Sequence, residues 1–179
     1  MILIGQYDSP FVRRVGIALT LYGIPFEHRP WSTFGDADKL RPYNPLTRVP
    51  TLVLDDGTAL VDSAAILDYV DSLVPAERRM FPVAEPMRHK ALRVAALSTG
   101  LADKAVSLFY EKRLHREVSD LWVERCRTQI GGVMKARISG NNFTTSWVSP
   151  PAVGYWAAYG NEFNGTAIAP TPVVTPATC

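Results

Sequence analysis

Apolar and polar positions follow two different periods in the first third of the chain, and each period predicts one type of element. An apolar run at 2–4 that a glycine closes is typical of a short buried strand. Over 10–22, apolar residues recur at steps of three and four, which predicts a helix with Ser9 as its N-cap and Gly23 at its end. Residues 26–29 predict a second strand. Strand, helix and strand in this order form a βαβ unit with parallel strands.

A hairpin and a third helix are predicted next. The apolar runs 51–54 and 59–61 flank an Asp-Gly pair, which is a strong hairpin signal. Asp62 and Ser63 then cap a helix that continues to about Leu73. The complete order is βαβ followed by ββα. The pattern therefore predicts a thioredoxin-like α/β domain.

Longer helical patterns occupy the middle of the chain. Apolar residues at helical spacing predict one long helix over 87–113 and another over 117–137. Two long amphipathic helices after an α/β module indicate a second, all-helical domain, so the predicted class is α/β plus all-α. The predicted divisions are a thioredoxin-like domain at 1–75, a proline-containing linker at 76–86, a partial helical domain at 87–138 and an irregular tail at 139–179.

The tail differs in composition from everything before it. Gly, Pro, Ser, Thr and Asn make up more than half of residues 139–179, and Glu162 is the single charged residue there. Its aromatic residues are too plentiful for a typical solvated disordered segment. Our hypothesis is that the helical domain is truncated or disrupted after about residue 137, by a frame change, a sequencing error or a degraded gene end.

Composition and charge exclude several classes of function. With 19 basic and 17 acidic residues the net charge is +2, which gives no electrostatic case for nucleic acid or an anionic membrane as the main partner. No apolar run approaches the roughly 20 residues of a membrane span, and the N-terminus has no signal-peptide pattern. Two cysteines without a CxxC pair and three histidines make a disulfide framework or a metal site improbable. We expect a cytoplasmic, metal-free protein.

Three places along the predicted domain hold residues that could take part in chemistry. Ser9, at a helix N-terminus, could donate a hydrogen bond to a thiolate and lower the pKa of that thiol, although position alone favours a simple N-cap. A cis bond between Val49 and Pro50 would leave the valine backbone free to pair with a peptide, although trans is the commoner form. Asp62 and Ser63 could hold an ammonium and a carboxylate group, or only cap their helix.

The three places together resemble a known family. The segments Ser9–Arg14, Asn44–Pro50 and Asp62–Ile66 closely resemble, in this order and spacing, the three motifs of glutathione transferases. They are most similar to bacterial forms with an active-site serine. The resemblance covers residues 1 to about 75 well and continues more weakly to about 137.

The resemblance implies a role for each residue of the three motifs. Ser9 matches the position that stabilises the glutathione thiolate. Val49 matches the residue whose backbone pairs with the cysteinyl part of glutathione, and Pro50 matches the cis-proline of the family. Asp62 and Ser63 match the acidic-Ser pair that grips the γ-glutamyl end, although many members have Glu at the first position.

Further residues and a partner follow from the same resemblance. It places Phe11 among the glutathione-binding residues and Arg48 near the glycine carboxylate. Asp103, on the first long helix, could reach the partner's γ-glutamyl ammonium across a dimer, although a solvated helix charge is the commoner case. The implied co-substrate is glutathione, without a metal, and the implied assembly is a homodimer.

Four functions remain open from the sequence. The first is a glutathione transferase that joins the glutathione thiolate to an electrophilic small molecule or reduces a peroxide. The second is a non-catalytic interaction module of the same fold, against which the intact three-part site argues. The third is a thiol-disulfide oxidoreductase, which we rank last because position 9 is Ser rather than Cys. The fourth is an inactive, damaged family member.

Overall fold

The computed structural model describes residues 1–135, 162–163 and 166–167. The last two segments are strands β5 (Glu162–Phe163) and β6 (Thr166–Ala167), which pair antiparallel and belong to a unit separate from residues 1–137. Apart from these two strands, the predicted irregular tail at 139–179 and the predicted disruption after about residue 137 lie outside the described residues.

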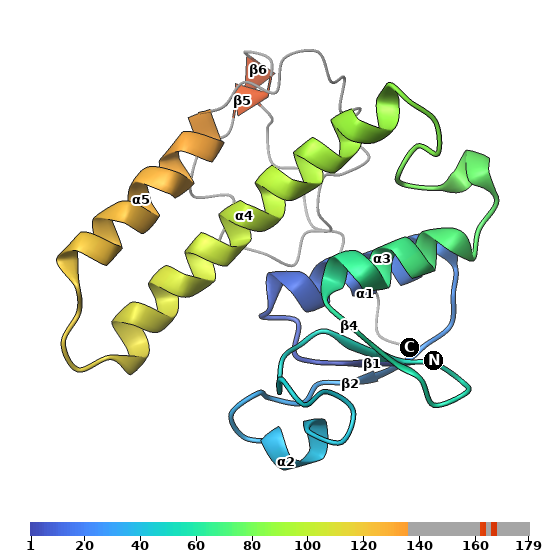
Figure 1. Ribbon diagram of the computed structural model, residues 1–179, viewed down its shortest axis with the longest axis horizontal. Helices are drawn as coiled ribbons and strands as arrows, with labels where there is room; N and C mark the ends of the chain where they lie inside the picture. Colours follow the sequence, from blue (N-terminus) through green and yellow to red (C-terminus); the bar gives the residue numbers. More distant parts are fainter. Residues whose placement is uncertain (136–161, 164–165, 168–179) are drawn as a thin grey trace, which may run out of the picture. The chain divides into compact units, whose positions relative to one another are not determined.

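One four-stranded sheet organises the N-terminal part (Figure 1). Its strands are β1 (Ile2–Ile4), β2 (Glu27–Arg29), β3 (Thr51–Val53) and β4 (Ala59–Val61), and its helices are α1 (Pro10–Tyr22), α2 (Ala37–Leu40) and α3 (Ser63–Ser72). The spatial order is β2-β1-β3-β4, with β1 parallel to β2 and antiparallel to β3. This is the thioredoxin-like βαβ-ββα arrangement, and the fold prediction is confirmed.

The two faces of the sheet hold separate apolar clusters. On one face α1 and α3 lie side by side and pack against the sheet through Leu3, Leu52 and neighbouring residues (Figure 1). On the opposite face Leu40 of α2 packs against Ile4 and Val53. The alternation of Leu3 and Ile4 between the two faces follows from the two-residue period of a strand. Helices on both faces fix β1, and with it the start of α1.

The segment after α3 is fastened to the N-terminal domain by a buried carboxylate. Asp71, near the end of α3, accepts hydrogen bonds from the Tyr22 hydroxyl and from the backbone N–H groups of Met80 and Phe81. Burial, followed by the bond to Asp71, raises the pKa of Tyr22 to about 12. Between these contacts runs the 3₁₀ turn Ala76–Arg78. Local sequence patterns gave no indication of this tie.

Two long helices follow, as predicted, and they pack against each other: α4 (Met87–Leu114) and α5 (Asp120–Lys135). The predicted start of the second helix at 117 is wrong, because Ser119 caps it. The Ser119 hydroxyl accepts a hydrogen bond from the Trp122 N–H at 3.3 Å. Glu111 of α4 is buried and accepts from the Ser119 N–H at 2.8 Å, so the turn between the helices is also held from α4.

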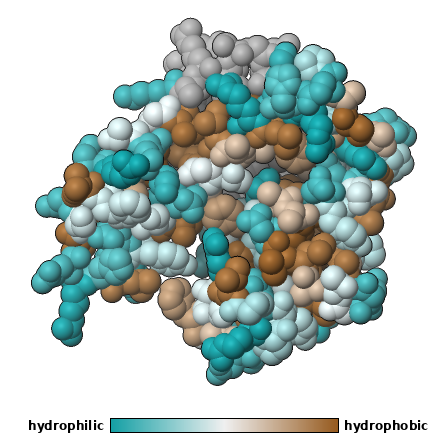
Figure 2. Space-filling view, in the orientation of Figure 1, coloured by the Kyte–Doolittle hydropathy of each residue, from teal (hydrophilic) through white to brown (hydrophobic). Residues whose placement is uncertain are grey.

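The helical pair keeps much of its apolar surface exposed. Large apolar side chains such as Phe109, Leu114 and Leu121 are open to solvent, and Glu111 is the one buried residue of α4, all of which the structure describes. Figure 2 shows apolar residues in patches among polar ones. In the described part of the chain, no helix combines the length and the apolar character needed to cross a membrane.

Candidate functional site

Ser9 lies at the N-terminus of α1, as predicted. Its backbone is extended, with φ −69° and ψ 122°, and its Oγ accepts a hydrogen bond from the Val12 N–H at 3.4 Å. A hydroxyl that accepts one bond still has its own hydrogen to donate. Capping the helix and donating to a thiolate are therefore compatible roles for Ser9. The two interpretations of this residue do not exclude each other.

The loop that carries Ser9 is held from several sides. Arg13 donates from Nε and Nη2 to the Tyr7 carbonyl oxygen, at 2.9 and 2.6 Å. The Tyr7 ring stacks on His28 with centroids 4.1 Å apart, and His28 Nε2 lies 2.8 Å from the Gly5 carbonyl oxygen. Burial raises the pKa of Tyr7. The path from β1 to α1 is thus fixed by side chains of α1 and β2.

The peptide bond between Val49 and Pro50 is cis, as the resemblance implied. Asn44 is almost fully buried and shapes this loop. Its Nδ2 donates to the Arg48 carbonyl oxygen at 2.8 Å and to Thr51 Oγ1 at 3.2 Å, while its Oδ1 accepts from Leu46 N. This network leaves the backbone of Val49 outside the hydrogen bonds of β3, which begins two residues later.

Gly5 brings the cis-proline loop against the start of α1. A Cβ on Gly5 would lie 2.5 Å from Val12 Cγ2 and 2.7 Å from Val49 Cβ, and Gly5 has φ +131°. Only glycine adopts that backbone at no steric cost and leaves room for both valines. The second motif therefore touches the first at the carboxyl end of β1.

The third motif is joined to α1 through an arginine. Asp62 has φ +71° and caps α3 by accepting from the Ala64 N–H at 2.7 Å. The neighbouring Ser63 is buried, and its Oγ accepts from Arg14 Nη1 at 3.2 Å. Burial lowers the pKa of the Arg14 guanidinium, and the negative charge of Asp62 acts in the opposite direction. Arg14 nevertheless stays a cation at neutral pH.

These contacts bring all three motifs to the N-terminal half of α1. The helix N-terminus carries a partial positive charge and free N–H groups, so it favours an anion. The guanidinium groups of Arg13 and Arg14 add two positive charges on the same helix. Among the described residues, no group of three His, Cys, Asp or Glu could hold a metal ion. The arrangement is suited to an anionic organic ligand.

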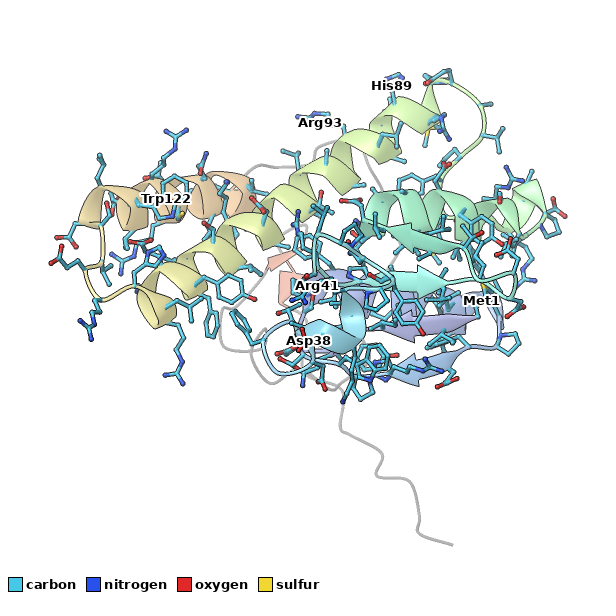
Figure 3. The ribbon with its side chains drawn as sticks, turned by 60° about the horizontal axis from the view of Figure 1, so that its bottom comes forward. Met1, Asp38, Arg41, His89, Arg93 and Trp122 are labelled. Atoms are coloured by element: carbon cyan, nitrogen blue, oxygen red, sulfur yellow. The ribbon has the colours of Figure 1, made fainter. Side chains whose placement is uncertain are left out.

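Three other predicted residues are placed differently. Phe11 is half-buried on the first turn of α1, and Arg48 is exposed beside Val49. The carboxylate of Asp103 is exposed and lies 3.1 Å from Lys104 Nζ on the same helix. The Lys104 ammonium also lies 5.7 Å from the centre of the Trp122 ring. Figure 3 labels Trp122 on α5. None of these contacts tests a role in glutathione binding.

A hollow of about 570 Å³ lies elsewhere, at the turn between α4 and α5. Tyr110, Glu111, His115 and Trp122 are among its lining residues, and it includes none of the three motifs. Its inner carboxylate is already satisfied, because Glu111 accepts from the Ser119 N–H and lies 2.8 Å from His115 Nδ1. The hollow is therefore not the candidate site.

Reasoning from sequence missed the supporting residues of the site. Gly5, Arg13, Arg14 and Asn44 each make a contact that positions a motif residue. The signals were present but local: a glycine ending a strand, two adjacent arginines on one helix turn, and an Asn-Pro pair of the kind that forms Asx turns. For Gly5 and Arg14 the partner lies far along the chain, in Val49 and Ser63.

Comparison with known proteins identifies the class of domain. Residues 3–78 match the family model of the glutathione S-transferase N-terminal domain. This range contains all three motifs and all of the sheet except Ile2 at the start of β1.

Individual relatives point the same way. The chain is 35% identical over 104 residues to the uncharacterized GST-like protein YibF of Escherichia coli (strain K12), covering 58% of this chain and half of that protein. In solved structures it is similar to a glutathione transferase family member from Pseudomonas fluorescens with bound glutathione, with 29% identity and a TM-score of 0.68, covering 74% of this chain and 67% of that one.

A second solved structure has the same relation. The glutathione S-transferase from Methylobacterium radiotolerans, in complex with glutathione sulfonate, has 30% identity and a TM-score of 0.69, covering 74% of this chain and 63% of that one. These comparisons support the glutathione S-transferase family for this chain. The chain spans about half the length of YibF, and the family model matches residues 3–78 of this chain.

Proposed function

We propose that this protein is a glutathione transferase with Ser9 as its catalytic residue. The glutathione thiolate attacks an electrophilic carbon of a small molecule, a C–S bond forms, and the leaving group departs with its electron pair. With a peroxide the thiolate would attack oxygen instead, and a second glutathione would complete the reduction. The observation that supports the proposal is the meeting of the three motifs at the N-terminal half of α1.

Each part of glutathione has a proposed partner. The Ser9 hydroxyl donates to the thiolate, and the Val49 backbone, which lies outside the hydrogen bonds of β3, pairs with the cysteinyl residue. Asp62 receives the γ-glutamyl ammonium, while Ser63 and the α3 N-terminus receive its carboxylate.

Three further groups complete the proposed site. Arg14 adds a positive charge beside Ser63. Arg48 faces the glycine carboxylate, and Phe11 lies beside the bound tripeptide. Such a reaction requires a compartment that supplies reduced glutathione, and the cytoplasm is the setting we propose.

Catalysis in this scheme comes from charge stabilisation and proximity. A free thiol has a pKa near 8.5, and a positive helix terminus with a hydrogen-bond donor lowers it. A hydrogen bond to a charged group contributes about 1.5–3 kcal/mol, which corresponds to about one to two pKa units. Removing the Ser9 hydroxyl should therefore lower the ratio of bound thiolate to bound thiol by about 10- to 100-fold.

The test is a glutathione titration that follows ultraviolet thiolate absorption, with the native chain and the Ser9→Ala variant. Ser119→Ala is a matched control, because Ser119 also caps a helix and accepts from the third following N–H, at 3.3 Å against 3.4 Å for Ser9. Both variants should lose about 1 kcal/mol of stability. Only Ser9→Ala should lose the thiolate signal. A folded native chain that forms no thiolate would refute the proposal.

We also propose that the protein forms a homodimer. Leu46 in the N-terminal domain and Phe109, Leu114 and Leu121 in the helical pair are large apolar side chains exposed to solvent. Size-exclusion chromatography with light scattering separates the possibilities. One species of twice the chain mass supports the dimer, a monomer contradicts it, and polydisperse aggregates favour a damaged family member. Asp103→Ala then tests the cross-dimer contact, since it should weaken glutathione binding only in a dimer.

A further inference from the structure

We propose that Arg13 is a positioning residue for Ser9, which fixes the peptide plane that leads into the catalytic hydroxyl. This inference rests on the proposed transferase function and adds a residue to its machinery. The side chain of Arg13 leaves α1 and turns back past the helix N-terminus to the Tyr7 carbonyl oxygen, six residues earlier.

The contact between Arg13 and Tyr7 has two donors on one acceptor. Nε lies 2.9 Å and Nη2 lies 2.6 Å from the same carbonyl oxygen. The guanidinium is planar and its N–H groups form a rigid fork, so two bonds to one oxygen define the direction of the carbonyl as well as its distance. A lysine ammonium on a flexible stem would define only the distance.

The neighbouring positions of the loop are held independently of Arg13. The Gly5 N–H donates to the Arg29 carbonyl oxygen at 2.9 Å, and the Ser9 N–H donates to the Gln6 carbonyl oxygen at 3.2 Å. The Tyr7 ring is confined between His28 and the backbone of Gly16, where an added Cβ would lie 2.7 Å from the ring. None of these contacts involves the Tyr7 carbonyl. The orientation of the peptide plane between Tyr7 and Asp8 therefore depends on Arg13.

Ser9 is the residue directly after Asp8, so its position depends on the orientation of the Tyr7–Asp8 peptide plane. If the plane rotates, the Ser9 hydroxyl moves relative to the thiol, while the Val49 backbone and the Asp62–Ser63 pair stay in place. A displacement of about 1 Å in a catalytic group can lower a rate by about a hundredfold. Loss of Arg13 should therefore impair thiolate formation and turnover, with little change in the affinity for glutathione.

The test compares Arg13→Met and Arg13→Lys in the full chain with Arg79→Met as control. Arg79 also donates from Nε to a backbone carbonyl oxygen, that of Val74 at 3.2 Å, but outside the three motifs. For each protein, the measurements are the dissociation constant for glutathione, the pH profile of bound thiolate absorption, kcat with a chloronitroarene electrophile, and the thermal midpoint.

We expect Arg13→Met to lower kcat and the neutral-pH thiolate fraction by about tenfold or more, with the dissociation constant changed less than about threefold. Arg79→Met should shift only the thermal midpoint. Arg13→Lys should recover part of the loss, and full recovery would overturn the two-donor argument. An unchanged thiolate profile in Arg13→Met would also overturn the inference. Failure of the native chain to form thiolate would instead count against the proposed function, so the two failures are distinguishable.

Discussion

Replacement of Gly5 by alanine is the most demanding test of how the site is assembled. Gly5 ends β1, and the first and second motifs touch each other across it. The new Cβ would lie 2.5 Å from Val12 Cγ2 and 2.7 Å from Val49 Cβ, where carbon atoms prefer about 3.5–4.0 Å. Relief requires a shift of about 1 Å in α1, in the cis-proline loop or in β1 itself.

Two effects add in the cost of Gly5→Ala. An L-residue held at φ +131° is in a sparsely populated region, which costs about 1–3 kcal/mol. Overpacking a filled site costs about 1–3 kcal/mol more. The sum of about 2–6 kcal/mol is a large part of the 5–15 kcal/mol that is usual for a domain. With a urea m-value of about 2 kcal/mol/M, the unfolding midpoint should fall by about 1–3 M.

The assay is urea unfolding of the full chain, with Gly23→Ala as the matched control. Gly23 also has a positive φ, +70°, but no atom lies within 4 Å of its Cβ position. Gly23→Ala should therefore show only the conformational cost, about 1–2 kcal/mol. The double variant Gly5→Ala with Val12→Ala removes the nearest methyl group and should recover about 1–3 kcal/mol of coupling.

Two results would refute this reasoning. If Gly5→Ala is no more destabilising than Gly23→Ala, the crowding at the carboxyl end of β1 is not real. If Val12→Ala gives no favourable coupling with Gly5→Ala, the steric conflict lies elsewhere. In either case the close approach of the cis-proline loop to α1 could no longer explain how the site forms.

The remaining predictions concern buried polar groups. Tyr22→Phe should cost about 1–3 kcal/mol in chemical unfolding, because Asp71 and the Met80 N–H each lose a partner. Since the folded-state pKa of Tyr22 is raised from 10.0 to about 12, its contribution is complete below pH 10 and is lost as the pH rises through 12. Ultraviolet titration should show a tyrosine that titrates near pH 12 and is absent in Tyr22→Phe. The hydrogen bond from the Ser119 N–H lowers the pKa of Glu111, so its contribution is present above its ordinary pKa of 4.5 and is lost as the pH falls below it. Glu111→Gln should flatten this acid dependence in thermal melts.

Local pattern was sufficient for most of the elements. Strands of three residues, helix periods, the Ser9 cap and the Asp-Gly hairpin are all properties of short windows, and short windows are what a sequence displays directly. The start of α5 was misplaced because Ser119 caps the helix, and Glu111 on another helix holds the Ser119 N–H.

The residues of the candidate site could be predicted from the sequence, whereas the contacts between them could not. Ser9, the Val49–Pro50 bond and the Asp62–Ser63 pair could be named from the sequence, because each is a turn or cap whose chemistry is local. Their meeting point could not be read from it. Arg13 and Arg14 are adjacent in the chain, yet successive residues of a helix point about 100° apart, so Arg13 meets the Tyr7 carbonyl and Arg14 meets Ser63.

By itself, then, the sequence determined which elements form and which residues can take part in the chemistry. The tertiary structure decided which of them meet. Gly5 is the clearest case: in sequence it is a glycine after a strand, while in the fold both Val12 and Val49 lie within 3 Å of the position that its Cβ would take. The contacts of Gly5 with Val49 and of Arg14 with Ser63 join residues more than forty positions apart, and their geometry is set by the packing of helices on the sheet rather than by any local preference.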